Sequence, residues 1–210
     1  MKRAYSSISL FVGFCSLTCL LLFSYGLYAE ESVLTNNGNS CPRKKPTNAR
    51  KHFEICTIKV KYHKSVLLLD AQIFYGFSKT ALRALESGVP ITVQLTIEFY
   101  RARDWVWDES IANLSQRFTL QYHTLTHKYV ITNINSKAKQ IFSTRAEAMD
   151  ALSQVKQLPV LDKKFIRSSS RHYARARARL LISHLPSALR LWAYMSSDWR
   201  LKSEWYQWPL

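Results

Sequence analysis

The sequence predicts a mainly β fold of the α+β kind, an antiparallel β-sandwich-like domain with two covering helices behind an N-terminal apolar helix. Residues 91–99 alternate strictly between apolar and polar side chains, weaker two-residue periods recur around them, and two short segments carry helix-capping signals. Hydrophobic residues make up 47% of the chain and aromatic residues 13%, which is enough to build a core. We therefore expect residues 53–210 to form a single β-rich domain.

The strands are predicted from side chains that point alternately to the two faces of a sheet. The clearest run extends from Ile91 to Phe99, where every second residue is apolar. Weaker alternation marks four further segments, 55–62, 66–75, 116–124 and 128–134. Only a short turn at 125–127 separates the last two segments, so the pattern predicts an antiparallel meander.

Two helices are predicted between these strands. Ser78 can cap a segment whose apolar stripe stops at Gly88. Thr144 and Glu147 have the spacing of a capping box, and the apolar face of the helix that they open runs to Val155. Because each helix joins two strands, we expect both to cover the sheets.

Two further strands are predicted near the C-terminus. After Arg171 the chain alternates arginine with alanine, so a strand places Arg175, Arg177 and Arg179 on one face and the alanines on the other. A helix would scatter these arginines around its axis. Residues 198–205 alternate again, with Trp and Leu side chains inward, and we expect them to form the final strand.

The N-terminus predicts export across a bacterial inner membrane. Lys2 and Arg3 precede residues 8–29, which hold no charged side chain and would span about 33 Å as a helix. Positive charge resists translocation, so the domain is expected to face the periplasm. Residues 1–29 are either a cleaved signal peptide or a retained inner-membrane anchor, because small-x-small cleavage patterns occur only imperfectly.

Residues 30–52 are predicted to be a polar, basic linker. Their Arg-Lys-Lys cluster at 43–45 is either part of a solvated tether or a contact for anionic head groups. Cys41 and Cys56 could form a disulfide in an oxidising compartment. The alternative is that Cys56 is a small core residue of the first strand.

The formal net charge of +16 predicts anionic partners. For an exported protein these would be anionic lipid or glycan, and we expect no nucleic-acid partner, because the chain has neither an RNA-binding aromatic motif nor a zinc-finger spacing.

Two groups of side chains are candidate ligand-binding sites. Arg175, Arg177 and Arg179 would stand about 6.5–7 Å apart along a strand and could bind successive phosphates or carboxylates. The alternative is a solvated strand face. Trp105 and Trp107 share a face of an extended chain and could stack on sugars, lipid or a partner, or else pack in the core or on a hairpin.

Signals for catalysis are weak. Asp104, Asp108 and Glu109 lie beside the two tryptophans, and paired carboxylates can cleave glycosidic bonds, but the neighbouring arginines favour local ion pairs. His123 and His127 flank a turn and would give only an incomplete metal site. We therefore expect a non-enzymatic protein with no cofactor or metal. The alternative is an envelope hydrolase that uses acidic and histidine side chains near the tryptophans.

Two long aromatic motifs remain. The first contains ALESGVPI and EFYRARDWVWDE between Ala84 and Glu109, and the second contains DWRLKSEWYQW between Asp198 and Trp208. These motifs resemble the bacterial family called domain of unknown function 4390, over about residues 55–208. The resemblance implies a proteobacterial protein with an export or anchor segment, and a membrane sensor kinase as a candidate partner. It implies no activity.

From these observations we expect an exported, non-enzymatic binding or interaction module that engages an anionic envelope ligand or a membrane signalling partner.

Overall fold

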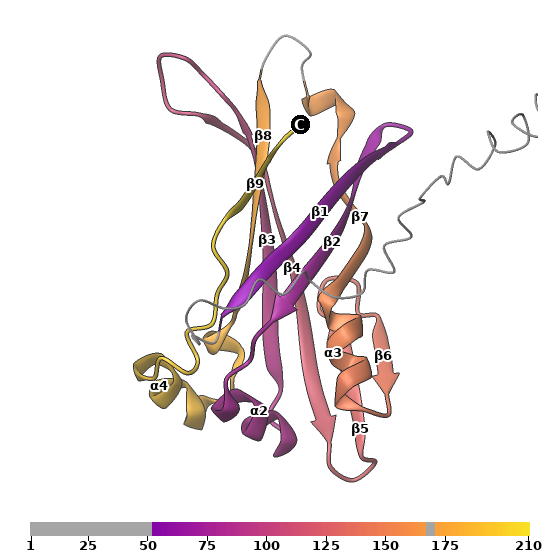
Figure 1. Ribbon diagram of the computed structural model, residues 1–210, viewed down its shortest axis with the longest axis vertical. Helices are drawn as coiled ribbons and strands as arrows, with labels where there is room; N and C mark the ends of the chain where they lie inside the picture. The colour runs from indigo at the N-terminus through magenta and orange to yellow at the C-terminus, as the bar shows by residue number, and fades with distance from the viewer. Residues whose placement is uncertain (1–51, 167–170) are drawn as a thin grey trace, which may run out of the picture. The chain divides into compact units, whose positions relative to one another are not determined.

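Two antiparallel sheets form the part of the chain that the computed structural model describes, residues 52–166 and 171–210 (Figure 1). The smaller sheet has the strand order β1-β2-β7, and the larger has the order β6-β5-β4-β3-β8-β9. The strands are β1 Phe53–His63, β2 Val66–Tyr75, β3 Ile91–Arg101, β4 Glu109–His123, β5 Lys128–Asn133, β6 Lys139–Phe142, β7 Gln154–Asp162, β8 His172–Leu180 and β9 Tyr206–Pro209. The predicted mainly β, antiparallel architecture is confirmed.

The described residues contain three α-helices, where the sequence predicts two. They are α2 Lys79–Glu86, α3 Arg145–Ser153 and α4 Ser187–Met195, and two 3₁₀ turns accompany them, η1 Lys163–Phe165 and η2 Ile182–His184. The prediction misses α4 because this helix carries no capping signal. Pro186 occupies its N-cap position and makes no side-chain hydrogen bond there.

The capping signals of the two predicted helices are confirmed. The Ser78 side chain accepts a hydrogen bond from the first turn of α2, and Gly88 follows the helix with a φ of +84°, a left-handed conformation that favours glycine. Thr144 and Glu147 form the capping box of α3. This helix ends earlier than predicted, because Val155 already belongs to β7.

Two strand predictions are wrong in extent or position, and two strands were missed. β4 starts at Glu109, seven residues before the predicted strand, and β6 and β7 were not predicted. β7 hides its period because its pairing with β2 shifts register twice and it contains Pro159. The final strand is β9; residues 198–205 make only an isolated bridge between Arg179 and Lys202 among the described residues.

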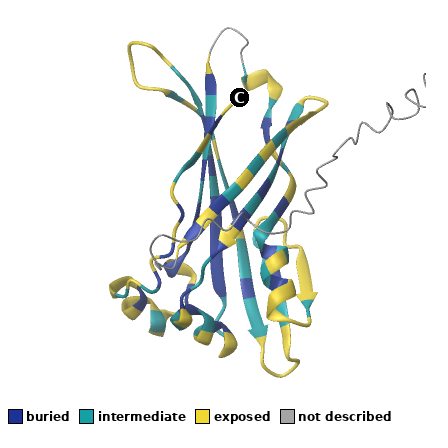
Figure 2. Ribbon diagram, in the orientation of Figure 1, coloured by how far each residue is buried: buried dark blue, intermediate teal, exposed yellow. Residues whose placement is uncertain are grey.

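The core lies between the two sheets. Leu69 and Ile73 from the smaller sheet and Leu95 and Phe99 from the larger sheet are fully buried in one continuous cluster. Figure 2 shows these buried segments in dark blue along the middle of the strands, with exposed residues at the hairpin ends and on the helices. The middle of β8 faces the core with three buried alanines, which buried His172 and Leu180 flank, and β1 contacts this strand.

The predicted export segment, residues 1–29, and residues 30–51 of the predicted linker lie outside the described residues. Within residues 52–166 and 171–210, no helix is long and apolar enough to cross a membrane.

Candidate functional site

The arginine row of β8 lies on the outer face of the larger sheet. The alanines between the arginines are fully buried in the core, so the predicted alternation of the strand is confirmed. The neighbouring strand β3 presents a polar residue opposite each arginine, Glu98 for Arg175, Thr96 for Arg177 and Gln94 for Arg179.

Arg175 has a charged partner and aromatic neighbours within the protein. Its Nε donates to Glu98 Oε2 at 2.7 Å, and its Nη2 donates to the Tyr100 hydroxyl oxygen at 3.0 Å. Its guanidinium carbon lies 4.9 Å from the ring centroid of Tyr100 and 4.4 Å from that of Trp205. The hydrogen bond with Glu98 raises the pKa of Arg175 further. This arginine therefore stabilises the sheet and has little capacity left for a ligand.

Arg177 and Arg179 differ from Arg175 because no carboxylate of the described residues lies within salt-bridge distance of either. The guanidinium carbon of Arg177 lies 4.4 Å from the Trp205 ring centroid. The sequence predicts that the Trp205 side chain faces the core. The ring is instead half-buried and lies against the arginines. Sequence reasoning missed this contact because it joins segments that no local pattern connects.

Two further cations share this face. Arg117 on β4 lies opposite Gln94, so it stands on the far side of β3 from Arg179. Lys202 pairs with Arg179 in the isolated bridge, on the other side of β8. Both lack a salt bridge to any described carboxylate. We refer to Arg117, Arg177, Arg179 and Lys202 together as the open cationic face.

Polar side chains of the sheet form the floor of the open cationic face. The amide nitrogen of Gln94 donates to Thr96 Oγ1 at 2.9 Å and to Ser115 Oγ at 3.1 Å. Its oxygen accepts from Nε of Arg117 at 3.4 Å. Gln94 is only 4% exposed, so this network holds the side chain in place and orients Arg117.

The two tryptophans lie at the tip of the β3–β4 hairpin. Trp105 is 97% exposed and Trp107 is 93% exposed, and Val106 between them is also exposed. The alternative of core or hairpin packing is therefore wrong, because almost all of both ring systems remains in contact with solvent.

Ion pairs hold the base of this tip. Glu109 accepts a hydrogen bond from Arg101 at 2.7 Å and another from Arg103, and Asp104 pairs with Arg171 at the start of β8. The predicted local ion pairing is confirmed for Glu109, whereas Asp104 pairs with an arginine 67 positions away.

The remaining carboxylate, Asp108, accepts a hydrogen bond from the Tyr173 hydroxyl at 2.6 Å. This bond and one from the Arg103 backbone lower the pKa of Asp108, and the bond to Asp108 raises the pKa of Tyr173 to about 12. The hydrogen bond from the Arg103 side chain likewise lowers the pKa of Glu109. Both acids therefore stay ionised at neutral pH, whereas a catalytic acid needs a raised pKa.

The histidine pair forms no metal site in the described part of the chain. His127 Nδ1 shares a hydrogen bond with the Tyr122 hydroxyl at 2.9 Å, and His123 is exposed at the end of β4. Across residues 52–166 and 171–210, no group of three or more potential metal ligands comes together.

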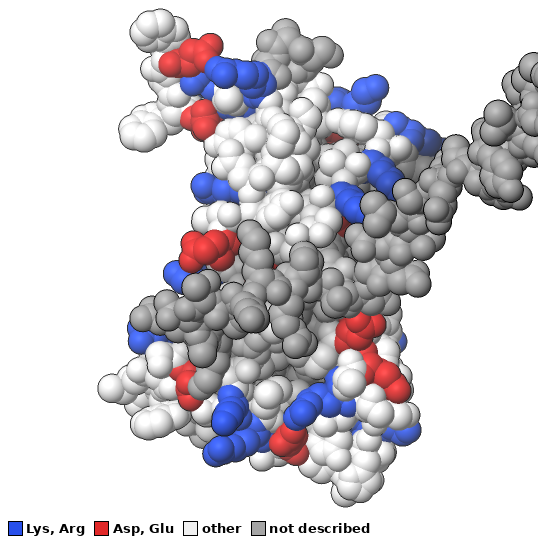
Figure 3. All heavy atoms as spheres, in the orientation of Figure 1, with Lys and Arg blue, Asp and Glu red and all other residues white. Residues whose placement is uncertain are grey.

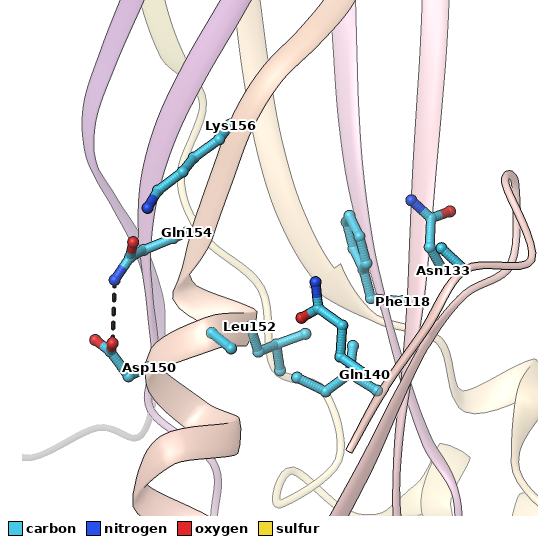
Figure 4. A pocket seen from close by; sticks show the side chains of 10 residues that line it. Phe118, Asn133, Gln140, Asp150, Leu152, Gln154 and Lys156 are labelled. Atoms are coloured by element: carbon cyan, nitrogen blue, oxygen red, sulfur yellow. Dashed lines mark hydrogen bonds between the residues drawn. The ribbon is translucent and has the colours of Figure 1, made fainter. Parts of the chain in front are cut away.

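A pocket of about 440 Å³ opens beside α3 (Figure 4). In Figure 4, Asp150, Gln154 and Lys156 line one side and Gln140 and Asn133 the other; Gln154 donates to Asp150 at 3.1 Å. Phe118, Ile131 and Leu152 supply apolar surface. Sequence reasoning missed this pocket because two of its elements, β6 and β7, were not predicted. Its polar groups carry both signs of charge and include no catalytic set.

Cys56 lies at a β-bulge, where the pairing of β1 with β2 shifts register between Ile55 and Thr57. It is half-buried, is disulfide-bonded, and is not part of the core cluster. Cys41 lies outside the described residues, so the Cys41–Cys56 pairing stays a prediction.

Comparison with known proteins identifies the family. No curated protein and no solved structure matches the chain. One family model, described as Domain of unknown function (DUF4390), matches residues 50–209, which include the motifs around the tryptophan tip and at the C-terminus. The match spans well over half of the sequence, and the chain therefore belongs to the DUF4390 family.

Proposed function

We propose that this protein is an exported, non-enzymatic binding module that holds an anionic ligand of the bacterial envelope on its open cationic face. The observation that carries the proposal is the contrast along β8, where Arg175 is satisfied by Glu98 while Arg177 and Arg179 have no described carboxylate partner. Like charges on neighbouring positions of a sheet repel one another. An anion bound between Arg177 and Arg179 would attract both guanidinium groups and offset their mutual repulsion.

The geometry favours an extended anionic polymer, such as an acidic glycan. Arginines two residues apart on a strand stand about 6.5–7 Å apart, a spacing that suits successive charged groups of a chain. Guanidinium groups bind phosphate, sulfate-like and carboxylate groups with paired hydrogen bonds. A sheet face is open and flat, whereas small molecules are usually held in concave pockets.

Export to the periplasmic side rests on the charge and hydropathy of residues 1–29, either as a signal peptide or as an inner-membrane anchor. A sensor-kinase partner rests on the family resemblance alone and stays a prediction.

The envelope-hydrolase alternative has weaker support. Its best acids, Asp108 and Glu109, have lowered pKa values and are held by Tyr173 and the arginines at the base of the tip. A general acid must keep its proton near the working pH, so these environments oppose that role.

The proposal is tested by titrating the full-length chain, in neutral detergent, with dextran sulfate. We expect Arg177→Gln/Arg179→Gln to weaken binding about tenfold or more, because a charge-assisted hydrogen bond contributes about 1.5–3 kcal/mol. The matched control is Lys79→Gln/Arg83→Gln on α2, which removes the same charge from exposed positions of another surface.

Binding should be retained in the control variant, and neutral dextran should not bind. Equal weakening in both double variants would mean that net charge alone attracts the polymer, and the open cationic face would not be a site.

A further inference from the structure

We infer that the end of the domain that carries Trp105 and Trp107 docks on the surface of an anionic phospholipid bilayer. We refer to residues 61–65, 101–109, 162–166 and 171 as the aromatic end. This inference does not depend on the open cationic face, because Arg177 lies six residues along β8 from Arg171, about 20 Å away.

The aromatic end consists of two pairs of segments that lie at the same end of the domain (Figure 1). The backbone N–H of Lys163 donates to the Ser65 carbonyl at 2.7 Å, and its ammonium lies 6.0 Å from the Tyr62 ring centroid, so η1 lies beside the β1–β2 turn. The backbone N–H of Ala102 donates to the Arg171 carbonyl at 2.8 Å, which joins the β3–β4 tip to the start of β8. In Figure 1 both hairpins and η1 lie at the upper end of the molecule.

Large apolar side chains are exposed on both hairpins and on η1. The exposed fractions are 53% for Tyr62 and 46% for Phe165, beside the nearly complete exposure of both tryptophans. Trp and Tyr side chains are enriched where membranes meet water, because their rings are apolar and their N–H or O–H groups keep a polar partner. The composition of this end therefore matches that of a membrane-interface surface.

The charge of the aromatic end is also suited to an anionic bilayer. The aromatic end holds seven cationic side chains and four carboxylates. The cations are Lys61, Lys64, Arg101, Arg103, Lys163, Lys164 and Arg171. Three of the carboxylates are held at the tip base by arginines or Tyr173, and the fourth, Asp162, lies near Lys164. Lys61 and Lys64 have no described salt bridge. Figure 3 shows lysine and arginine atoms over both hairpins at this end.

The shape of the tip favours a bilayer over a protein partner. Two nearly fully exposed tryptophans on a protruding hairpin form a convex surface, which can enter the interface of a bilayer without a matching pocket. The tip is also held in advance, since Glu109 and Asp108 tie its base to Arg101 and Tyr173. Preorganisation of this kind lowers the entropy that binding must remove.

Fluorescence quenching by brominated phospholipids tests this inference on the full-length chain. All six tryptophans lie between residues 105 and 208, so the predicted membrane segment at 8–29 contributes no tryptophan signal. In vesicles of phosphatidylethanolamine and phosphatidylglycerol with brominated acyl chains, we expect part of the emission to be quenched. We expect that quenched part to be lost in Trp105→Ser/Trp107→Ser and to be retained in Trp192→Ser, which alters an exposed tryptophan of α4.

Each result decides the inference. Quenching that persists in the hairpin variant, or that is lost in Trp192→Ser instead, would assign docking to another surface and overturn the inference. The absence of any quenching in the wild-type chain would overturn it as well. Quenching of the same size in phosphatidylcholine vesicles would contradict the role of charge. The hairpin variant should still bind dextran sulfate like the wild-type chain, which separates a failure here from a failure of the proposed function.

Discussion

The two faces of β8 carry opposite kinds of side chain. Ala174, Ala176 and Ala178 are fully buried between the sheets, while the arginines between them face outward. On the inner face, the three alanines are fully buried, so close packing leaves little room for a larger side chain at these positions. On the outer face, the role of each arginine depends on which side chains of other strands reach it. The same alternating pattern thus encodes a strict packing requirement on one side and a variable polar surface on the other.

The largest expected effect on stability comes from placing a leucine on each face of β8 in turn. Ala176→Leu adds apolar volume where β8 packs against the core, so we expect the free energy of unfolding to fall by about 1–3 kcal/mol. Arg177→Leu places the same side chain on the outer face and should change it by no more than about 0.5 kcal/mol. Urea unfolding of both variants makes the comparison; similar losses would show that the faces are equally constrained.

A smaller loss of stability should distinguish the surroundings of Arg175 from those of Arg177. Glu98→Gln removes the charge that Arg175 pairs with, and we expect a loss of about 1 kcal/mol, because the pair is partly exposed and solvent screens it. Thr96→Ala, which alters the residue opposite Arg177, should cost less. If thermal unfolding shows equal losses, the distinction between a structural and an open arginine is wrong.

The smallest effect concerns the pH dependence of the tip base. Asp108 and Glu109 have lowered pKa values in the folded chain, so their hydrogen bonds stabilise the tip above their ordinary pKa values of 3.8 and 4.5. This contribution is lost as the pH falls through the lower, folded-state values. In Tyr173→Phe, the pKa of Asp108 should rise toward its ordinary value, which carboxyl-carbon NMR titration can measure. An unchanged pKa would show that the Tyr173 hydroxyl does not hold this carboxylate.

Sequence periodicity predicted those parts of the fold in which one face is buried and pairing is regular. Strands β1, β2, β3, β5 and β8 and the caps at Ser78 and Thr144 are such elements. β7 could not be recognised, because it follows α3 without a loop and its register shifts break the two-residue period. Residues 198–205 do alternate, and Trp199 and Leu201 are buried, but the regular pairing with β8 begins only at Tyr206. A period shows which side chains turn inward and does not show which strand lies alongside.

The sequence predicted which residues belong to the candidate sites, but not which side chains surround them. The sequence placed Arg175, Arg177 and Arg179 on one face, but the partner that satisfies Arg175 comes from β3, 77 positions earlier. For the two tryptophans, the sequence left open whether they bind a ligand or pack against the protein. The long β3–β4 hairpin shows why they stay exposed, because it carries its tip beyond the core. Long-range pairing decides both outcomes, and no local signal reports it.

The position of β3 between β4 and β8 has a consequence for the synthesis of the chain. Its first neighbour follows directly in the chain, whereas the second is supplied only by residues 172–180, in the last fifth of the sequence. Until those residues emerge, β3, whose apolar face belongs to the core, has one unpaired edge, which is a template for aggregation. The longer the synthesis of residues 172–180 is delayed, the longer this edge of β3 stays without its second neighbour.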